Sequence, residues 1–413
     1  MADNGTSDAA AAAPPHDAGA AGRCPACLSV DLRGFLEYEQ VPVHGVLLMY
    51  SREAGRAHPR ADLQLAVCSA CGFVTNVRFE AGQHEYGPDY EESQHCSSTF
   101  SRFAAELARR LVDDFDLREK SIVEIGCGKG EFLAELCRVG NNRGVGIDPA
   151  CRPERIDAAT AERIEFRPEF YSAQHAGLAA DMICCRHTLE HIQPVHEFLT
   201  LVRRNIKSGT RPVVFCEVPS LEIIVREARF WDLYYEHCSY FDRASLATLF
   251  ERTGFDVLDV WLDYDEQYLC LTARPSDQAA DERRESRATA NADPDVASPM
   301  ADFAARCRAS ITQWREVLAA WSEQQLRPVL WGAGSKCVAF LAATGLDEEV
   351  EYVVDINPYK QDRFLPGTGH LVVAPESLRE YRPRRVLAMN SVYRQEIQAQ
   401  LDALGLDAEL HTL

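Results

Sequence analysis

Apolar positions along the chain follow two different spacings, and each spacing predicts a different kind of element. Between residues 97 and 115, apolar residues recur three and four positions apart, which is typical of an amphipathic helix. Short apolar runs then alternate with helical segments: SIVEI before a glycine turn, then GVGI, DMICC and PVVFCEV. Strands that alternate with helices predict a doubly wound parallel α/β sheet. Residues 254–274 read as a closing β-hairpin.

A second, smaller Rossmann-like unit is predicted near the C-terminus. Residues 301–326 have the pattern of an amphipathic helix, and PVLWGAGSK followed by EYVVDINP repeats the order strand, glycine turn, helix, strand, Asp. We therefore expect the following organisation: a disordered tail (1–22), a zinc-binding module (23–85), a methyltransferase-like α/β domain (86–275), a charged linker (276–300), and a C-terminal helix with its Rossmann-like domain (301–413).

Composition narrows the classes of partner. The formal net charge of −20 and a pI near 5.1 exclude nucleic acid as the main partner, because no basic stripe is present. No run of about 18 apolar residues predicts a membrane span, and the N-terminus has no secretory signal pattern. We expect a cytoplasmic protein whose 15 cysteines stay reduced.

Four of these cysteines form two CxxC pairs, Cys24 with Cys27 and Cys68 with Cys71. Two such pairs can close a tetrahedral thiolate site around zinc, and a site with four protein ligands has no open position for catalysis. The pairs are separated by a polar stretch of about 40 residues, longer than in a compact zinc ribbon. We expect a structural Zn²⁺; four unrelated buried cysteines are the alternative.

The sequence VEIGCGKGEFL predicts a nucleotide-like site after a strand. Gly126, Gly128 and Gly130 form a GxGxG turn, and Asp148 stands at the end of the next strand, where a carboxylate can accept hydrogen bonds from ribose hydroxyls. Glu124 before the turn favours S-adenosylmethionine, because a carboxylate there can meet its cationic amino-acid end. Cys127 and Pro149 flank the same site.

In motif order, the chain resembles the three-part sugar C-methyltransferases, whose type cases methylate C-3 of a nucleotide-linked 4-keto-deoxyhexose. The resemblance rests on the paired CxxC module, on VEIGCGKG and GVGIDP, on YYEHCSYF, and on the later GAGSK, VVDINPYKQ and LPGT. It implies a class I methyltransferase core that uses S-adenosylmethionine, in an antibiotic-sugar pathway. It also implies a small-molecule acceptor, a nucleotide-linked keto-sugar.

The resemblance assigns roles to residues of YYEHCSYF. Carbon beside a ketone must lose a proton before it can attack a methyl group, and the resemblance makes His237 the general base. Glu236 and Tyr234 would orient the base and hydrogen-bond the sugar. The alternative for His237 is a structural histidine before the next helix, although Asp242 is the expected cap of that helix. The resemblance also maps active-site roles onto His191 and Tyr90.

Three further positions concern the donor and the acceptor. His187 stands where the family commonly has Asn, so it places an ionisable group beside the donor. In the C-terminal unit, Lys336 follows the glycine turn and could meet a phosphate at a helix N-terminus, and Asn390 is the one residue that persists from a family Leu-Pro-Trp-Asn run. We expect both to face the substrate.

Two other functions remain open from the sequence. One is an O- or N-methyltransferase acting on another small metabolite, which needs little help from a base. The other is a non-catalytic binding protein built from a zinc module and a methyltransferase fold; Glu124, the three glycines and Asp148 argue against it.

Overall fold

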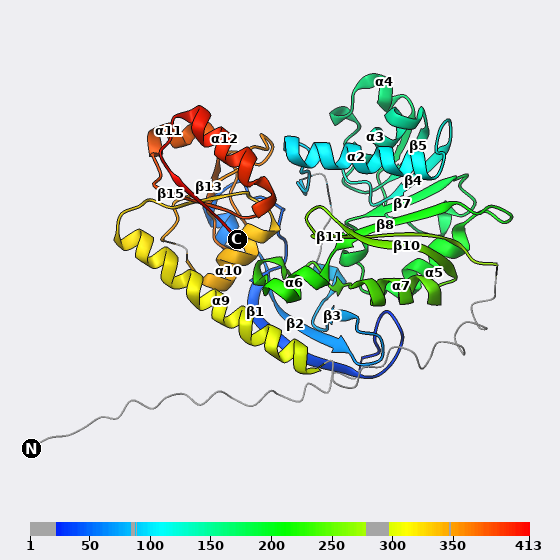
Figure 1. Cartoon of the computed structure of the whole chain (residues 1–413), viewed down its shortest axis with the longest axis horizontal. Helices are drawn as coiled ribbons and strands as arrows, with labels where there is room; N and C mark the ends of the chain where they lie inside the picture. The colour runs from blue at the N-terminus through cyan, green and yellow to red at the C-terminus, as the bar shows by residue number, and fades with distance from the viewer. Residues whose placement is uncertain (1–21, 84–86, 88, 278–296, 347) are drawn as a thin grey trace, which may run out of the picture.

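The computed structural model describes residues 22–83, 87, 89–277, 297–346 and 348–413. Nearly all of the expected tail, most of the expected linker and the expected boundary between residues 85 and 86 therefore lie outside the described residues. Two α/β units stand side by side, and the N-terminal strands with the long helix α9 run beneath both (Figure 1). In the described part of the chain, no helix is long and apolar enough to cross a membrane.

The larger unit is built on a seven-stranded sheet with the order β10-β11-β8-β7-β4-β5-β6. The inner strands are parallel, and β11 pairs antiparallel with β8 and with β10, which confirms the expected doubly wound sheet with a closing hairpin. The strands are β4 (Ser121–Ile125), β5 (Arg143–Ile147), β6 (Ile164–Arg167), β7 (Met182–Arg186), β8 (Val213–Pro219), β10 (Phe255–Asp263) and β11 (Tyr268–Pro275).

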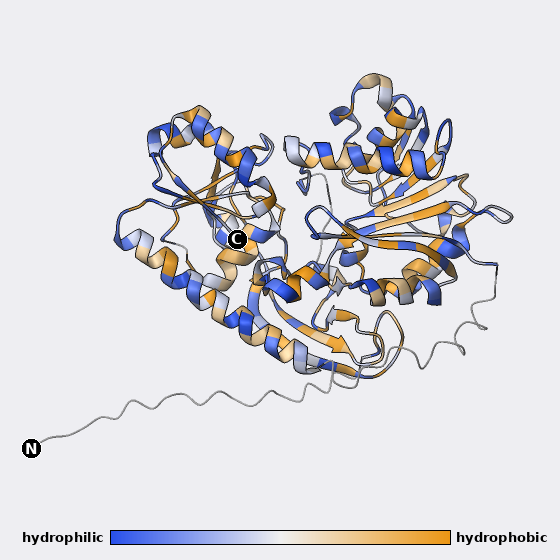
Figure 2. Ribbon diagram, in the orientation of Figure 1, coloured by the Kyte–Doolittle hydropathy of each residue, from blue (hydrophilic) through white to orange (hydrophobic). Residues whose placement is uncertain are grey.

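Helices cover both faces of this sheet, and Figure 2 shows apolar residues concentrated along its strands. The predicted cap is confirmed: the Asp242 side chain accepts a hydrogen bond of 2.7 Å from the backbone amide of Ser245 at the start of α7. The helices are α2 (Ser98–Asp114), α3 (Glu131–Gly140), α4 (Ala158–Ala161), α5 (Val195–Asn205), α6 (Leu221–Glu227) and α7 (Arg243–Arg252).

The C-terminal unit is a second Rossmann-like sheet, as its sequence pattern predicts. Its five strands are parallel, in the order β14-β13-β12-β15-β16. The strands are β12 (Val329–Trp331), β13 (Tyr352–Val354), β14 (Leu371–Val373), β15 (Arg385–Ala388) and β16 (Glu409–Thr412); the helices are α9 (Ala297–Glu323), α10 (Ser335–Thr344), α11 (Leu378–Tyr381) and α12 (Arg394–Leu404).

The N-terminal segment forms a four-stranded antiparallel sheet with the order β1-β2-β3-β9. The stretch between the cysteine pairs, which the sequence presents as a polar connection, carries β1 (Leu32–Pro42), the short helix α1 (Arg52–Arg56) and most of β2 (Arg60–Cys68). β3 (Val74–Asn76) follows the second pair. The fourth strand, β9 (Ser239–Tyr240), comes from the middle of the methyltransferase-like unit, so this sheet is not built from one contiguous segment.

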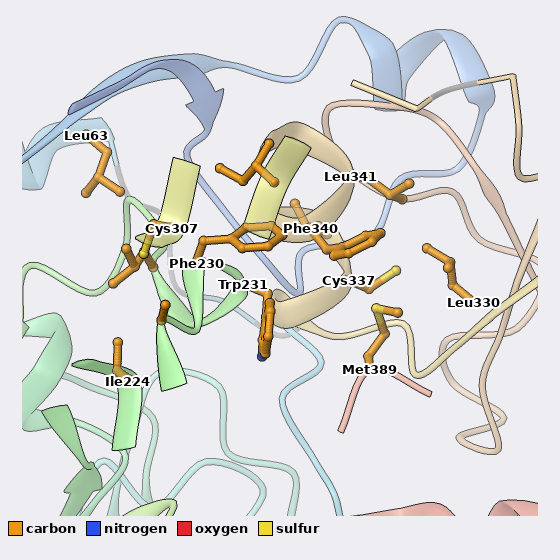
Figure 3. Close-up of a cluster of buried hydrophobic side chains, with 14 of the residues drawn as sticks. Leu63, Ile224, Phe230, Trp231, Cys307, Leu330, Cys337, Phe340, Leu341 and Met389 are labelled. Carbon is orange, nitrogen blue, oxygen red and sulfur yellow. The ribbon is translucent and has the colours of Figure 1, made fainter. Parts of the chain in front are cut away.

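One hydrophobic core joins all three parts of the molecule. Leu63 of β2, Phe230 and Trp231 of the middle unit, Cys307 of α9 and Phe340 of α10 belong to a single buried cluster (Figure 3). Phe230 stacks on Phe340, with ring centroids 5.8 Å apart. The three parts therefore share apolar surface, which fixes the walls of any site that lies between them.

Candidate active site

A cavity of about 630 Å³ lies where the middle unit, the connecting segment 90–97 and the C-terminal unit meet. Its wall includes the residues that the sequence assigns to the donor, to catalysis and to the acceptor, with two exceptions, Gly130 and Glu236. The predicted residues in the wall are Tyr90, Glu124, Gly126, Cys127, Gly128, Asp148, Pro149, His187, His191, Tyr234, His237, Lys336 and Asn390.

The glycine turn between β4 and α3 forms part of this wall. Gly126, Gly128 and Gly130 all have positive φ angles, of 70°, 51° and 88°, which side chains rarely adopt. A Cβ atom at Gly126 would lie 1.9 Å from Oγ1 of Thr188. Glycine is therefore required both by the backbone and by close packing, and the turn leaves main-chain atoms open to the cavity.

Asp148, directly after β5, holds the turn in place. Its carboxylate accepts hydrogen bonds from the amides of Gly128, at 2.9 Å, and Ala150, at 2.7 Å. Burial raises the pKa of this carboxyl, and the two amides partly offset that rise. Each carboxylate oxygen has a second lone pair, so Asp148 can hold the turn and still accept from a ribose hydroxyl.

Glu124 lies under the turn and is 2% exposed. Burial raises the pKa of its carboxyl to about 8, against the influence of the Arg186 guanidinium. Among the described residues, Oε2 of Glu124 has no hydrogen-bond partner. A buried carboxylate oxygen of this kind suits a cationic ligand group. These residues therefore fit S-adenosylmethionine, with Glu124 toward its ammonium and Asp148 toward its ribose.

Beside the donor residues lies a compact network of charges. His187 has a φ of 46°, and its Nε2 lies 2.9 Å from Oε1 of Glu217, while its Nδ1 lies 3.5 Å from Oε1 of Glu190. Burial works against a charged imidazole here, but the two carboxylates outweigh it and raise the pKa of His187 to about 9. Arg186 also pairs with Glu217, at 2.7 Å. The two carboxylates therefore favour the charged form of His187.

Three aromatic side chains that the sequence singles out meet in the cavity wall. The rings of His191 and His237 are perpendicular, with centroids 4.7 Å apart, and Tyr234 contacts His237 at 4.5 Å. Nδ1 of His191 lies 3.1 Å from the carbonyl oxygen of Glu236. Because a carbonyl can only accept, Nδ1 of His191 carries a proton.

Glu236 is one of the two predicted residues outside the cavity wall; the other, Gly130, is the last glycine of the turn. The described residues that line the cavity do not include it, and its side chain is fully buried. Its carboxylate accepts hydrogen bonds from the amide of Gly45 at 2.8 Å, the hydroxyl of Tyr90 at 2.9 Å and the hydroxyl of Ser335 at 3.3 Å. Glu236 thus joins three parts of the chain behind the wall, a place from which it can orient the loop.

The two residues predicted to meet substrate from the C-terminal unit are engaged with the middle unit. The ammonium of Lys336 contacts Oδ1 of Asp232, and the same oxygen accepts a hydrogen bond of 2.9 Å from the Tyr234 hydroxyl. The side-chain amides of Asn390 and Gln267 form a reciprocal pair, at 2.9 and 3.0 Å. Both predicted residues line the cavity and also contact the middle unit.

Sequence reasoning missed a second group of cavity residues next to Tyr90. Glu92 lies 3.4 Å from the ammonium of Lys129, which is buried and donates to the backbone carbonyls of Tyr90 and Ala150. Burial raises the pKa of Glu92 to about 7, and Lys129 opposes the rise. The sequence signal for this pair was Lys129, which stands between two glycines of the turn. A lysine that is buried at such a place needs an acidic partner, and Glu92 is that partner.

The four predicted metal ligands converge at one point. The sulfurs of Cys24 and Cys71 lie 3.8 Å apart, those of Cys27 and Cys68 lie 3.5 Å apart, and all four are within 4.8 Å of one another. A tetrahedral zinc with bonds of about 2.3 Å places its sulfurs about 3.8 Å apart. The residues therefore fit Zn²⁺, and the geometry leaves no ligand position for substrate.

Comparisons with known proteins agree with this arrangement. Residues 97–260 match a family model described as a methyltransferase domain, and residues 269–407 match one described as a C-methyltransferase C-terminal domain. In an alignment that covers 91% of this chain and 90% of the relative, the sequence is 28% identical to the C-methyltransferase NovU of Streptomyces niveus.

Solved structures with lower similarity include two methyltransferases. A Burkholderia thailandensis 1,6-didemethyltoxoflavin N1-methyltransferase with bound S-adenosylhomocysteine is 18% identical, with a TM-score of 0.34, over 44% of this chain and 82% of that one. The Synechocystis magnesium protoporphyrin IX methyltransferase is 15% identical, with a TM-score of 0.33, over 43% and 84%. TM-scores this low do not bear on function.

Proposed function

We propose that this chain, which matches family models of a methyltransferase domain and of a C-methyltransferase C-terminal domain, methylates a carbon beside the ketone of a nucleotide-linked deoxysugar. The methyl donor is S-adenosylmethionine, which supplies an electrophilic methyl group when it is bound. One observation carries this proposal: the donor residues Glu124 and Asp148 share a single cavity with the ring cluster of Tyr234, His191 and His237.

The chemistry needs a base because a carbon beside a ketone is not nucleophilic until it loses its proton. In our proposal His237 takes that proton and the electron pair moves to the ketone oxygen as an enolate. The enolate carbon then forms the new bond to the methyl carbon as the methyl–sulfur bond breaks, and the ketone is restored. His237 returns to its neutral form by giving its proton to solvent.

The surrounding residues support this step by position. Glu236 is adjacent to His237 in the chain, and its carboxylate is held by Gly45, Tyr90 and Ser335. The loop that carries the base is therefore fixed from three directions. Because the Tyr234 hydroxyl donates to Asp232, its oxygen is left to accept a hydrogen bond from a sugar hydroxyl.

The donor residues line one side of the cavity, and the side beside the C-terminal unit remains for the acceptor. Asp355, Asn357 and Lys360, which follow β13, line the same cavity, as do Ser335 and Lys336 at the start of α10. A nucleotide on that side would place its sugar toward the ring cluster. Holding the acceptor carbon in line with the methyl group is then a matter of positioning, which is worth several kcal/mol in well-oriented reactions.

A labelled-product experiment tests the proposal. Wild-type protein should transfer ¹³C-methyl from labelled donor to a panel of nucleotide-linked keto-sugars, and NMR of the product should show a new carbon–carbon bond. Label found on oxygen or nitrogen would contradict the proposal and favour the O- or N-methyltransferase function. Failure to bind S-adenosylmethionine in calorimetry would favour the non-catalytic function.

Solvent exchange tests the role of His237. In heavy water, the wild-type protein should catalyse exchange of deuterium into the keto-sugar acceptor, at the carbon beside its ketone. H237A should lose this exchange while it still binds S-adenosylmethionine. General-base loss typically lowers the rate about 10²- to 10⁴-fold. Exchange that persists in H237A but stops in H191A would assign the base to His191.

A further inference from the structure

The strand that follows His237 is part of the cysteine module. β9 begins two residues after His237 and pairs antiparallel with β3, which begins three residues after Cys71. The register places Tyr240 opposite Val74 and Ser239 opposite Thr75. The loop that carries the proposed base is therefore hydrogen-bonded to the sheet whose strands adjoin the four cysteines.

The hydrogen bonds between the two segments converge on one atom. The carbonyl oxygen of Cys238, the residue after His237, accepts from Oγ1 of Thr75 at 2.8 Å and from the backbone amide of Asn76 at 3.0 Å. Thr75 is 2% exposed and Asn76 is fully buried, so water cannot replace these donors. Two donors on one carbonyl fix the orientation of the Cys238–Ser239 peptide, one residue after His237.

The same loop is fixed to the segment that carries His191. Oγ of Ser239 donates a hydrogen bond of 2.8 Å to the carbonyl of Ile192, and Nδ1 of His191 bonds the carbonyl of Glu236. A shift of β9 would therefore move both histidines relative to each other. The perpendicular arrangement of their rings, with centroids 4.7 Å apart, therefore depends on these two hydrogen bonds.

At its other end, β3 is fixed by the cysteines. Cys68 closes a tight turn in which its carbonyl accepts from the amide of Gly72 at 2.9 Å and its own amide donates to Phe73 at 2.9 Å. Cys68 and Cys71, the two ligands in this turn, are buried within the same apolar cluster as Phe73 and Phe241. The rings of Phe73 and Phe241 lie 5.2 Å apart, so the turn and the far end of the base loop also share side-chain packing.

From these contacts we propose that the four-cysteine site positions the active-site histidines, and that Thr75 is the positioning residue that connects them. Zinc bound by the cysteines holds the β2–β3 turn, the turn sets the direction of β3, and Thr75 holds the Cys238 carbonyl beside His237. The proposal rests on the proposed function in so far as His237 is the base. According to this proposal, the four-cysteine module affects kcat and does not affect binding of S-adenosylmethionine.

Substitutions at Thr75 test the proposal. T75V keeps the shape of the side chain but removes the donor, and T75S restores the donor. T75V should lower kcat about 10- to 100-fold, as expected when a reacting group moves by a fraction of an ångström to an ångström, with an unchanged Kd for S-adenosylmethionine. T75S should recover most of the wild-type kcat.

A matched control separates positioning from simple destabilisation. Thr253 is also buried and donates from Oγ1 to a backbone carbonyl, that of Leu249, at 2.9 Å, but it lies outside the cavity wall. T253V should lower stability without changing kcat of the folded protein. Equal kcat in T75V and wild type, or an equal loss of kcat in T75V and T253V, would overturn the proposal.

Hydrogen exchange gives a readout that does not depend on the acceptor. Removal of zinc with a chelator should speed amide exchange in residues 74–76 and 238–241, while residues 385–404 of the C-terminal unit exchange as before. Unchanged exchange at 238–241 in zinc-free protein would overturn the proposal. This result decides the matter even if no keto-sugar is methylated, an outcome that would count against the proposed function alone.

Discussion

The backbone amide of Gly45 donates a hydrogen bond of 2.8 Å to the carboxylate of Glu236, 191 positions further along the chain. The hydroxyl of Ser335 reaches the same carboxylate oxygen from the C-terminal unit. A single buried carboxylate on the base loop thus binds both the N-terminal segment and the C-terminal unit. No local pattern around Gly45 indicates this role, because its partners come from distant segments.

Substitution of Gly45 tests how far the site depends on this junction. A Cβ atom at Gly45 would lie 2.3 Å from Oγ of Ser335 and 2.7 Å from Oε1 of Glu236. We expect G45A to lower the free energy of unfolding by about 1–3 kcal/mol, as overpacking does, and to lower kcat. At Gly82 a Cβ meets nothing within 4 Å, so G82A is the control. Urea unfolding of both variants makes the comparison, and equal stability would contradict the expectation.

Elements whose signals are local were predicted from the sequence. The strand, glycine turn and helix around Gly126, the closing hairpin and the cap at Asp242 all depend on residues within a few positions of one another. The fourth strand of the N-terminal sheet was not predicted, because its partner strand lies in another part of the chain. The contact of Lys336 with Asp232 was not predicted either, because it follows only from the packing of two units.

Asp148 is expected to govern donor affinity. D148A removes the acceptor for the amides of Gly128 and Ala150 together with the acceptor for a ribose hydroxyl. The loss of a charge-assisted hydrogen bond costs roughly 1.5–3 kcal/mol, which corresponds to a Kd about 10- to 100-fold higher. Calorimetric titration with S-adenosylmethionine measures it.

Asp181 supplies the control for this experiment. Its carboxylate also accepts from a backbone amide, that of Ser121 at 3.0 Å, but it lies outside the cavity wall. D181A should leave the Kd for the donor unchanged. A Kd that D148A does not alter would show that the ribose is held elsewhere.

The cysteine site predicts one zinc per chain. Because ligands must be assembled by folding, metal-binding energy contributes to folding energy, and the double variant C24S/C27S should lose both the zinc and the stability of the N-terminal sheet. C96S, which alters the exposed cysteine, should keep the metal. Metal analysis with thermal unfolding makes the measurement. A second equivalent of metal would point to Glu190, His191 and His237, whose potential ligand atoms also lie within 4.8 Å of one another.

His187 predicts a particular dependence of stability on pH. Although burial opposes its charge, Glu190 and Glu217 raise its pKa from 6.5 to about 9. A group whose pKa is raised on folding stabilises the folded state fully below its unfolded pKa, and the contribution is lost as pH rises through the folded pKa. The stability difference between wild type and H187N should therefore be largest below about pH 6.5 and shrink toward pH 9.

Denaturant unfolding of both proteins at pH 6, 7.5 and 9 measures this difference. Stability curves that stay parallel over the whole range would contradict a charged His187.

The hydrogen bond between Thr75 and Cys238 spans 163 positions of the chain, and this separation has a consequence during synthesis. When β3 leaves the ribosome, the strand that completes its sheet has not yet been made, so β3 waits as an open strand edge. Contacts that close long loops form late because their entropic cost must be met first. An unpaired edge is a template for pairing with other chains. Translation arrested before residue 238 should therefore yield nascent chains that self-associate, whereas chains that extend well beyond residue 241 should not.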